Sequence, residues 1–119
     1  TIQQRVTEAS AMIDSAELLL RRNCRDIMVE ANAGRELPMP LRARARRDHA
    51  YAPMIAAQAV EKLLRASGGQ GIYEDFEIQR CYRDIFAATS HIGINWDAGA
   101  LQYGQLTLGV GQLEAFAWI

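Results

Sequence analysis

The stretch IQQRVTEASAMIDSAELLLRRNCRDIMVEANA, residues 2–33, decides the fold of this chain. Its apolar residues recur at spacings of three and four, which places them on one stripe of an α-helix. Those positions are Ile2, Val6, Ala9, Ile13, Ala16, Leu20, Cys24, Ile27 and Ala31. Further leucines and methionines widen the stripe, so we expect one long helix that forms a wall of a helical bundle.

The segment after this helix predicts a loop and then a second long helix over residues 41–67. Gly34 is a suitable residue for a helix C-terminus, and Pro38 and Pro40 cannot continue the first helix. Apolar residues then return at helical spacing. Pro53 lies inside this second segment, where it predicts a kink because proline removes one backbone hydrogen bond.

Four arginines crowd the start of the second helix, at Arg42, Arg44, Arg46 and Arg47, and Asp48 follows them. A cluster of this kind can bind an anion or nucleic acid. Its spacing distributes the guanidinium groups around the helix, however, and an acid lies next to them. We therefore interpret the cluster as a solvated, ion-paired helix start.

The glycines of SGGQG, residues 67–71, end the second helix, and Asp75 is a candidate N-cap for a third. Apolar spacing continues far enough to predict one continuous or slightly bent helix over 75–103. Two shorter helices broken near residues 88–90 are the alternative. Beyond residue 103 the periodicity is lost, which predicts an extended C-terminal arm over 104–119. The chain is thus expected to form a single all-α domain, an up-down bundle.

The composition is that of a globular protein and excludes several classes of function. The 119 residues carry a formal net charge of −1, so the charge does not indicate binding to nucleic acid. No apolar run reaches the roughly 18 residues of a membrane span. Cys24 and Cys81 form neither a metal motif nor a disulfide framework, and we expect both to be reduced and buried in a cytoplasmic protein. Because Thr1 begins inside an amphipathic pattern, we expect a fragment of a longer chain.

The glycine turn formed by Gly68, Gly69, Gln70 and Gly71 is the first candidate site. Glycines allow positive φ angles and a close approach of the backbone, which a phosphate-binding loop requires. The alternative is an ordinary helix cap and turn. The turn follows a helix and matches no nucleotide-binding fingerprint, so the residues alone leave both interpretations open.

His91 is the second candidate. On a continuous helix its face also carries Asp84, Ala87, Ala88, Asn95 and Ala98. Alanines on the flanking turns leave space that another molecule could fill, although a structural histidine remains the alternative. The histidine lacks a companion at metal-binding spacing. A Ser-His-Asp hydrolase site is also unsupported, because Ser90 and His91 point in different directions on a helix.

The segment LLRASGGQGIYEDFEIQRCYRDI, residues 63–85, resembles the C-terminal helical domain of the acyl-CoA dehydrogenase superfamily. In that superfamily a GGxG turn precedes a helix with an RxxRD sequence, here residues 68–71 and 80–84. The resemblance implies a four-helix bundle that follows two other domains. The dehydrogenase branch has a catalytic glutamate a few residues later, whereas this chain has no carboxylate between Asp84 and Asp97. The sequence instead resembles the flavin-dependent monooxygenase branch, the oxygenase components of two-component aromatic hydroxylases.

The resemblance implies roles for both candidate sites. His91 is expected near the flavin C4a position, where it helps to form or hold the C4a-hydroperoxyflavin, and Asn95 is a weaker candidate for the substrate pocket. Residues 68–71 are expected to contact reduced flavin, FMN or FAD, in many members that of a neighbouring subunit. Dioxygen as co-substrate, an aromatic or heteroaromatic substrate, a separate flavin reductase and a homotetramer complete these expectations. The 119 residues alone are expected to be inactive.

Two other functions remain open. The chain could belong to an acyl-CoA dehydrogenase whose base lies elsewhere, which FAD reduction by acyl-CoA without a reductase would reveal. It could also be a non-catalytic helical oligomerisation module, which would bind a partner protein and no flavin.

Overall fold

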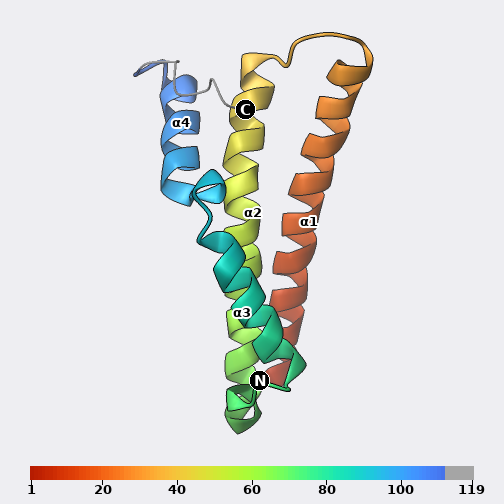
Figure 1. Cartoon of the computed structure of the whole chain (residues 1–119), viewed down its shortest axis with the longest axis vertical. Helices are drawn as coiled ribbons and strands as arrows, with labels where there is room; N and C mark the ends of the chain where they lie inside the picture. The colour runs from red at the N-terminus through yellow and green to blue at the C-terminus, as the bar shows by residue number, and fades with distance from the viewer. Residues whose placement is uncertain (112–119) are drawn as a thin grey trace.

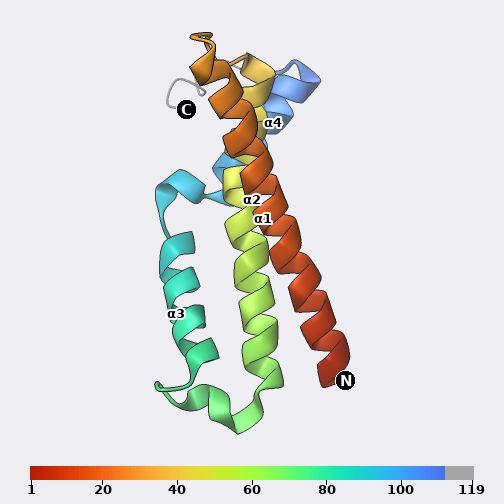
Figure 2. The ribbon, with the colours of Figure 1, turned by 90° about the vertical axis from the view of Figure 1, so that its right-hand side faces the viewer.

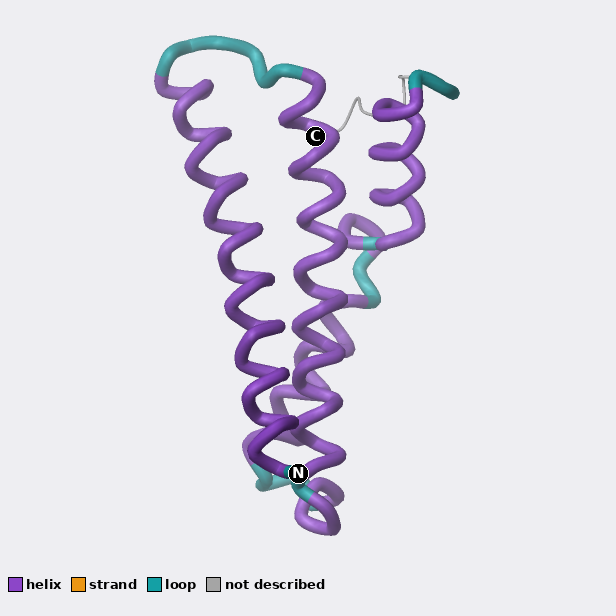
Figure 3. The backbone as a smooth tube through the Cα atoms, turned by 180° about the vertical axis from the view of Figure 1, so that it is seen from behind, coloured by secondary structure: helices purple, strands orange, loops and turns teal. Residues whose placement is uncertain are grey.

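The computed structural model describes residues 1–111, and these form four α-helices and two short 3₁₀ turns without a β-strand (Figure 1, Figure 3). The elements are α1 (Ile2–Asn32), α2 (Met39–Ala66), η1 (Gly68–Ile72), α3 (Glu77–Thr89), η2 (Ile92–Ile94) and α4 (Trp96–Leu108). The all-α prediction is confirmed. In this described part, no helix is long and apolar enough to cross a membrane.

Helix α2 is the centre of the molecule, which measures 50 × 29 × 24 Å. Helix α1 lies antiparallel to it on one side, and α3 and α4 follow one another along its other side (Figure 1, Figure 2). The path is therefore up through α1, down through α2 and up again through α3 and α4. Helix α3 packs against the C-terminal half of α2, whereas α4 packs against its N-terminal half.

Local sequence explains the ends of the two long helices. The Thr1 hydroxyl accepts a hydrogen bond from the Gln4 backbone N–H, and the Gln4 side chain accepts one from the Thr1 amino group, which forms a capping box. At the other end Gly34 adopts a left-handed conformation, with φ +68°. Pro38 precedes α2 and Pro40 lies in its first turn, where a missing N–H is harmless.

Small side chains form most of the core. The buried apolar residues are Ala9 and Ala16 on α1, and Ala43, Ala45, Ala50, Ala52, Ile55 and Ala59 on α2. Because alanine projects only a methyl group, the helices can approach closely, and each contact contributes little hydrophobic stabilisation. Many larger apolar side chains of the predicted α1 stripe remain exposed, among them Ile2, Val6 and Ile13.

A buried polar network joins α1 to α2. Asp48 is 1% exposed, and its carboxylate accepts hydrogen bonds from Asn23 Nδ2 at 2.8 Å, Arg22 Nη2 at 3.1 Å and Arg47 Nε at 2.7 Å. We call these four residues the Asp48 network. Burial raises the pKa of Asp48, but the hydrogen bonds from Arg47, Asn23 and Arg22 outweigh it and hold that pKa below its ordinary value. The carboxylate is therefore ionised and paired at neutral pH.

This network corrects the interpretation of the arginine cluster. The ion pairs expected there exist, since Arg47 pairs with Asp48 and Arg44 pairs with Asp26 of α1. The cluster is not a solvated helix start, however, because Arg46 and Asp48 are buried. The spacing of the arginines correctly distributes their guanidinium groups around the helix. It could not show that α1 covers one side of this helix and α4 covers another.

The continuous helix predicted over 75–103 does not form. Helix α3 ends at Thr89, and α4 begins at Trp96 after an extended His91 and the η2 turn. The Thr89 and Ser90 hydroxyls both donate to the Phe86 carbonyl, at 3.1 and 2.9 Å, so side chains take over hydrogen bonding at the helix end. The alternative of two helices with a break near residues 88–90 describes the structure.

Other sequence expectations also differ from the structure. Phe76, not Asp75, occupies the N-cap position of α3, and it makes no side-chain capping bond. The arm expected over 104–119 is helical up to Leu108, and its residues 112–119 lie outside the described part. Cys24 is exposed and Cys81 half-buried, so neither is the buried residue expected, although both are free thiols.

Candidate active site

The glycine turn lies at the end of α2, where the chain reverses into α3. Gly68 has φ +64°, a left-handed conformation that ends the helix. A Cβ on Gly71 would lie 3.0 Å from Leu64 Cδ1 and 3.3 Å from the Leu64 carbonyl oxygen, so a larger residue would displace the turn. The turn therefore has a structural role at these two positions.

Gly69 has no such structural requirement. It has no positive φ angle, and a Cβ on it would meet nothing within 4 Å. Gly68, Gly69 and Gln70 are all exposed, so the backbone is open to a close approach from outside. This accessible backbone leaves room for the close approach of a ligand.

His91 lies in the extended segment between α3 and α4, not on a helix. Its Nδ1 accepts a hydrogen bond from the Gly93 backbone N–H at 2.9 Å, and its side chain is exposed. The helix face that it was expected to share with Asp84, Ala87 and Asn95 does not exist, because the helix ends two residues earlier. In the neutral ring this bond leaves the proton on Nε2, where a reacting group can meet it.

Asn95 caps α4 and also lines a cavity. Its Oδ1 accepts a hydrogen bond from the Ala98 backbone N–H at 3.0 Å. The cavity has a volume of about 310 Å³ and opens between α2, α3 and the start of α4. Its lining residues are Ala50, Met54, Ala57, Gln58, Glu61, Tyr82, Ile85, Phe86, Thr89, Ile94, Asn95 and Trp96. Three aromatic rings and a few polar groups suit a small aromatic molecule.

The structure does not bring the two predicted sites together. The glycine turn and the segment that carries His91 lie at opposite ends of α3 (Figure 2). The 13 residues of this helix span roughly 20 Å at 1.5 Å per residue. The segment between α3 and α4 that carries His91 does, however, contribute Ile94 and Asn95 to the lining of the cavity, beside Thr89 at the end of α3. Asn95 therefore lines the cavity and His91 lies in the adjoining segment, whereas the glycine turn is a separate candidate site.

A residue that the sequence did not single out from its cluster contacts the His91 loop. Arg46 of α2 is 6% exposed and donates a hydrogen bond to the Gly93 carbonyl oxygen. Its Nε also donates to Gln102 Oε1 of α4 at 3.2 Å. No sequence signal distinguishes this arginine from its neighbours Arg44 and Arg47. The Asn95-Trp96-Asp97 sequence could have indicated the break before α4, because Asn95 is a good N-cap residue and Asp97 places an acid in the first turn of a new helix.

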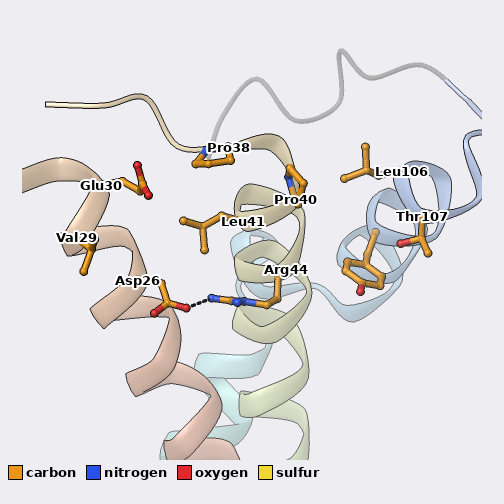
Figure 4. A pocket seen from close by; sticks show the side chains of 10 residues that line it. Asp26, Val29, Glu30, Pro38, Pro40, Leu41, Arg44, Leu106 and Thr107 are labelled. Atoms are coloured by element: carbon orange, nitrogen blue, oxygen red, sulfur yellow. Dashed lines mark hydrogen bonds and ion pairs between the residues drawn. The ribbon is translucent and has the colours of Figure 1, made fainter. Parts of the chain in front are cut away.

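A larger groove, of about 840 Å³, lies at the end of the molecule opposite the glycine turn, between the end of α1, the start of α2 and α4. Its floor holds the ion pair of Arg44 and Asp26, and Pro38, Pro40 and Leu41 border it (Figure 4). None of the candidate site residues lines this groove. The Arg44 guanidinium is also engaged by Asn23 at 3.0 Å, so it is already bonded within the fold.

Comparison with known proteins gives consistent results. The family model described as "Acyl-CoA dehydrogenase, C-terminal domain" matches residues 1–96. The oxygenase component of the FADH2-dependent resorcinol hydroxylase of Rhizobium sp. strain MTP-10005 is 36% identical, and the alignment covers 92% of this chain and 28% of that relative. The oxygenase subunit HsaA of a flavin-dependent monooxygenase from Rhodococcus jostii RHA1 is 34% identical, with coverages of 89% and 28%.

The fold agrees with a solved structure. The crystal structure of 3-HSA hydroxylase from Rhodococcus sp. RHA1 superposes with a TM-score of 0.89 at 31% identity, covering 97% of this chain and 30% of that one. The chain therefore spans less than a third of the length of the relatives described here.

Proposed function

Because the chain belongs to the family of acyl-CoA dehydrogenase C-terminal domains, we propose that it is the C-terminal domain of a flavin-dependent monooxygenase that hydroxylates an aromatic or heteroaromatic molecule. The observation that carries this is the placement of His91 in a loop that borders an aromatic-lined cavity. Both relatives are named as the oxygenase part of a flavin-dependent enzyme, which favours this function over acyl-CoA dehydrogenation and over a purely structural module.

The residues present fit a flavin at two places. The open backbone of Gly68 and Gly69 leaves room for a phosphate. His91 lies in the segment between α3 and α4 that contributes Ile94 and Asn95 to the cavity, and its Nε2 is not used by the hydrogen bond to Gly93. Reduced flavin, when bound, supplies the activation of dioxygen. His91 donates or holds a proton through Nε2 while the substrate is hydroxylated, and the aromatic rings around the cavity exclude water from it. Given the separation along α3, the turn serves the flavin of a neighbouring subunit.

Several partners follow from the proposal. Reduced flavin comes from a separate reductase, since the first relative is named an oxygenase component and FADH2-dependent. FADH2 is accordingly preferred to FMNH2. A cytoplasmic homotetramer completes the proposal, and its support is the set of large apolar side chains exposed on α1 and α4, including Leu18, Met28, Leu101 and Leu108.

The decisive experiment is His91→Ala in the full-length protein, supplied with FADH2 and with resorcinol as the first of a panel of phenols. A lost proton donor should lower the hydroxylation rate by roughly 10²-fold or more. Oxidation of FADH2 by dioxygen should then yield hydrogen peroxide in place of hydroxylated product. His49→Gln is the matched control, because His49 lies on α2 and does not line the cavity. Unchanged coupling in His91→Ala would sink this role, and reduction of bound FAD by acyl-CoA would support a dehydrogenase instead.

The proposed substrate contact of Asn95 can be separated from its capping role. Asn95→Ser keeps a side-chain oxygen for the Ala98 N–H but shortens the group that faces the cavity. We expect a higher KM for the phenol with a melting temperature close to that of the wild type. An unchanged KM would remove Asn95 from the pocket.

For the glycine turn, Gly69→Val is the informative change, because neither φ nor neighbouring atoms oppose a side chain there. We expect weaker flavin binding by titration and an unaltered melting temperature. Flavin binding equal to that of the wild type would reduce the turn to its structural role.

A further inference from the structure

Arg46 differs from the other arginines at the start of α2 in the direction of its contacts. Arg44 pairs with Asp26 of α1, and Arg47 pairs with Asp48 within α2. Arg46 instead reaches the opposite side of the molecule, where it donates to the Gln102 side chain and the Gly93 carbonyl oxygen. It is 6% exposed, so the bond to Gly93 is shielded from competing water.

Gly93 links this arginine to His91. While its carbonyl accepts from Arg46, its N–H donates to His91 Nδ1 at 2.9 Å. The imidazole also lies directly against Gly93, since a Cβ there would be 2.9 Å from Nδ1 and 3.0 Å from Cε1. The orientation of the ring is therefore set by Gly93, and Arg46 holds Gly93 from the interior.

Helix α4 docks at the same turn of α2. A Cβ on Gly99 would lie 3.1 Å from both Ala50 Cβ and the Arg46 carbonyl oxygen, so glycine permits the close approach of the two helices. Gln102 lies one turn further along α4 and is also buried. Arg46 thus connects α4 and the His91 loop through one side chain.

We propose that Arg46 is a positioning residue for His91: its guanidinium anchors the Gly93 carbonyl, and the Gly93 N–H fixes the orientation of the imidazole. This inference rests on the proposed function of His91. Arg46 acts through Gly93 and does not itself take part in proton transfer. A lysine at this position has several N–H donors but no planar fork, so it replaces only part of the arrangement.

The test uses Arg46→Met and Arg46→Lys in the full-length protein, with two measurements. Hydrogen exchange of the amides in residues 90–95 reports the order of the loop. The amount of hydroxylated product formed per FADH2 consumed, the coupling ratio, reports how efficiently flavin oxidation leads to hydroxylation. We expect Arg46→Met to speed exchange in 90–95 by tenfold or more and to lower the coupling ratio toward that of His91→Ala. Arg46→Lys should recover part of both.

Asp48→Asn is the matched control, because Asp48 is equally buried on α2 but bonds to α1. It should lower the melting temperature and leave exchange in 90–95 and coupling unchanged. If Arg46 were merely structural, Arg46→Met would behave in the same way as this control, and that result would overturn the proposal. Where His91→Ala does lower coupling, faster exchange with unaltered coupling in Arg46→Met would overturn the proposal as well.

If Arg46→Met does not fold, Gln102→Met is the second variant, because it removes one hydrogen-bond partner of Arg46 and keeps the arginine. We expect faster exchange in 90–95 and a lower coupling ratio, both by less than in Arg46→Met. If Gln102→Met changes neither measurement, the proposal is overturned. The two hypotheses fail separately. If His91→Ala leaves coupling intact, the proposed function fails, while exchange in 90–95 still decides whether Arg46 anchors the loop.

Discussion

The two sides of α2 differ in how completely the described chain covers them. Toward α1, the Asp48 network and buried alanines such as Ala9 and Ala16 form an interface with hydrogen-bonded polar groups. Toward α3, none of that helix's own residues is buried, and Phe86 is 63% exposed. The contact between α1 and α2 is therefore a scaffold of buried polar bonds, whereas α3 leaves surface available for a ligand or another domain. The outer faces of α1 and α4 also expose large apolar side chains.

The break between α3 and α4 belongs to the second side. A continuous helix would have placed His91 on a regular face, but the extended segment lets it contact Gly93 and frees Asn95 to cap α4. Loops held on a rigid scaffold commonly carry functional residues. The contrast between scaffold and loop predicts which substitutions change stability and which change function.

Asp48→Ala should give the largest effect on stability, because it leaves Arg22, Arg47 and Asn23 without their shared acceptor. Breaking a buried charge network by removing one partner costs about 3–5 kcal/mol. Thermal or urea unfolding of the full-length protein measures the loss. Glu17→Ala is the exposed comparison, since its pair with Arg21 lies on the surface of α1 and should be worth less than about 1 kcal/mol. Equal losses would contradict the scaffold description.

Gly99→Val should have the next largest effect, because its side chain would enter the contact between α4 and α2. Overpacking of this kind costs about 1–3 kcal/mol. Gly104→Ala is the matched change in the same helix: its Cβ meets nothing within 4 Å, so it should stabilise the protein by roughly 0.5–1 kcal/mol. Unfolding curves that move in the same direction for both variants would argue against close docking of α4.

Tyr103→Leu tests a weaker link between the two sides. The Arg47 guanidinium donates to Asp48 and also lies 4.5 Å from the centre of the Tyr103 ring, which connects the Asp48 network to α4. Loss of the cation–π contact should cost about 0.5–1 kcal/mol. In an Asp48→Asn background the cost should change, because Arg47 is then less firmly held. A double-mutant cycle measures that coupling, and strict additivity would show that the link carries nothing.

The smallest effect concerns pH. Burial lowers the pKa of His49 below its ordinary 6.5, and Arg46 adds to this while Asp48 opposes it. Between the lowered folded value and 6.5 the unfolded chain binds more protons, so stability falls as the pH drops through this window. In His49→Gln the melting temperature should therefore depend less on pH over that range. At lower pH the sign is the same for Asp48, whose depressed pKa adds stability that is lost as the carboxylate is protonated.

Helix positions were the part of the fold that local sequence indicated well. Periodicity predicted helices over 2–33 and 41–67, and the structure has α1 at Ile2–Asn32 and α2 at Met39–Ala66. The break at residues 90–95 was harder to predict from the sequence, because apolar residues continue at helical spacing across it. The side-chain caps that end α3 at Ser90 and begin α4 at Asn95 act over only a few residues. His91 could be singled out as a candidate from its residue type, but its contact with Gly93 could not.

The all-α class, the two long helices and the residue types at the candidate site follow from local sequence, because helical periodicity and capping act over neighbouring positions. The burial of Asp48 against α1, the contact of Arg46 with α4 and the place of Gly93 between Arg46 and His91 depend instead on how the helices pack. The contacts of Asp48 with α1 and of Arg46 with α4 and Gly93 join residues more than 20 positions apart. Their existence depends on which helices pack together and how closely, and no local pattern encodes that.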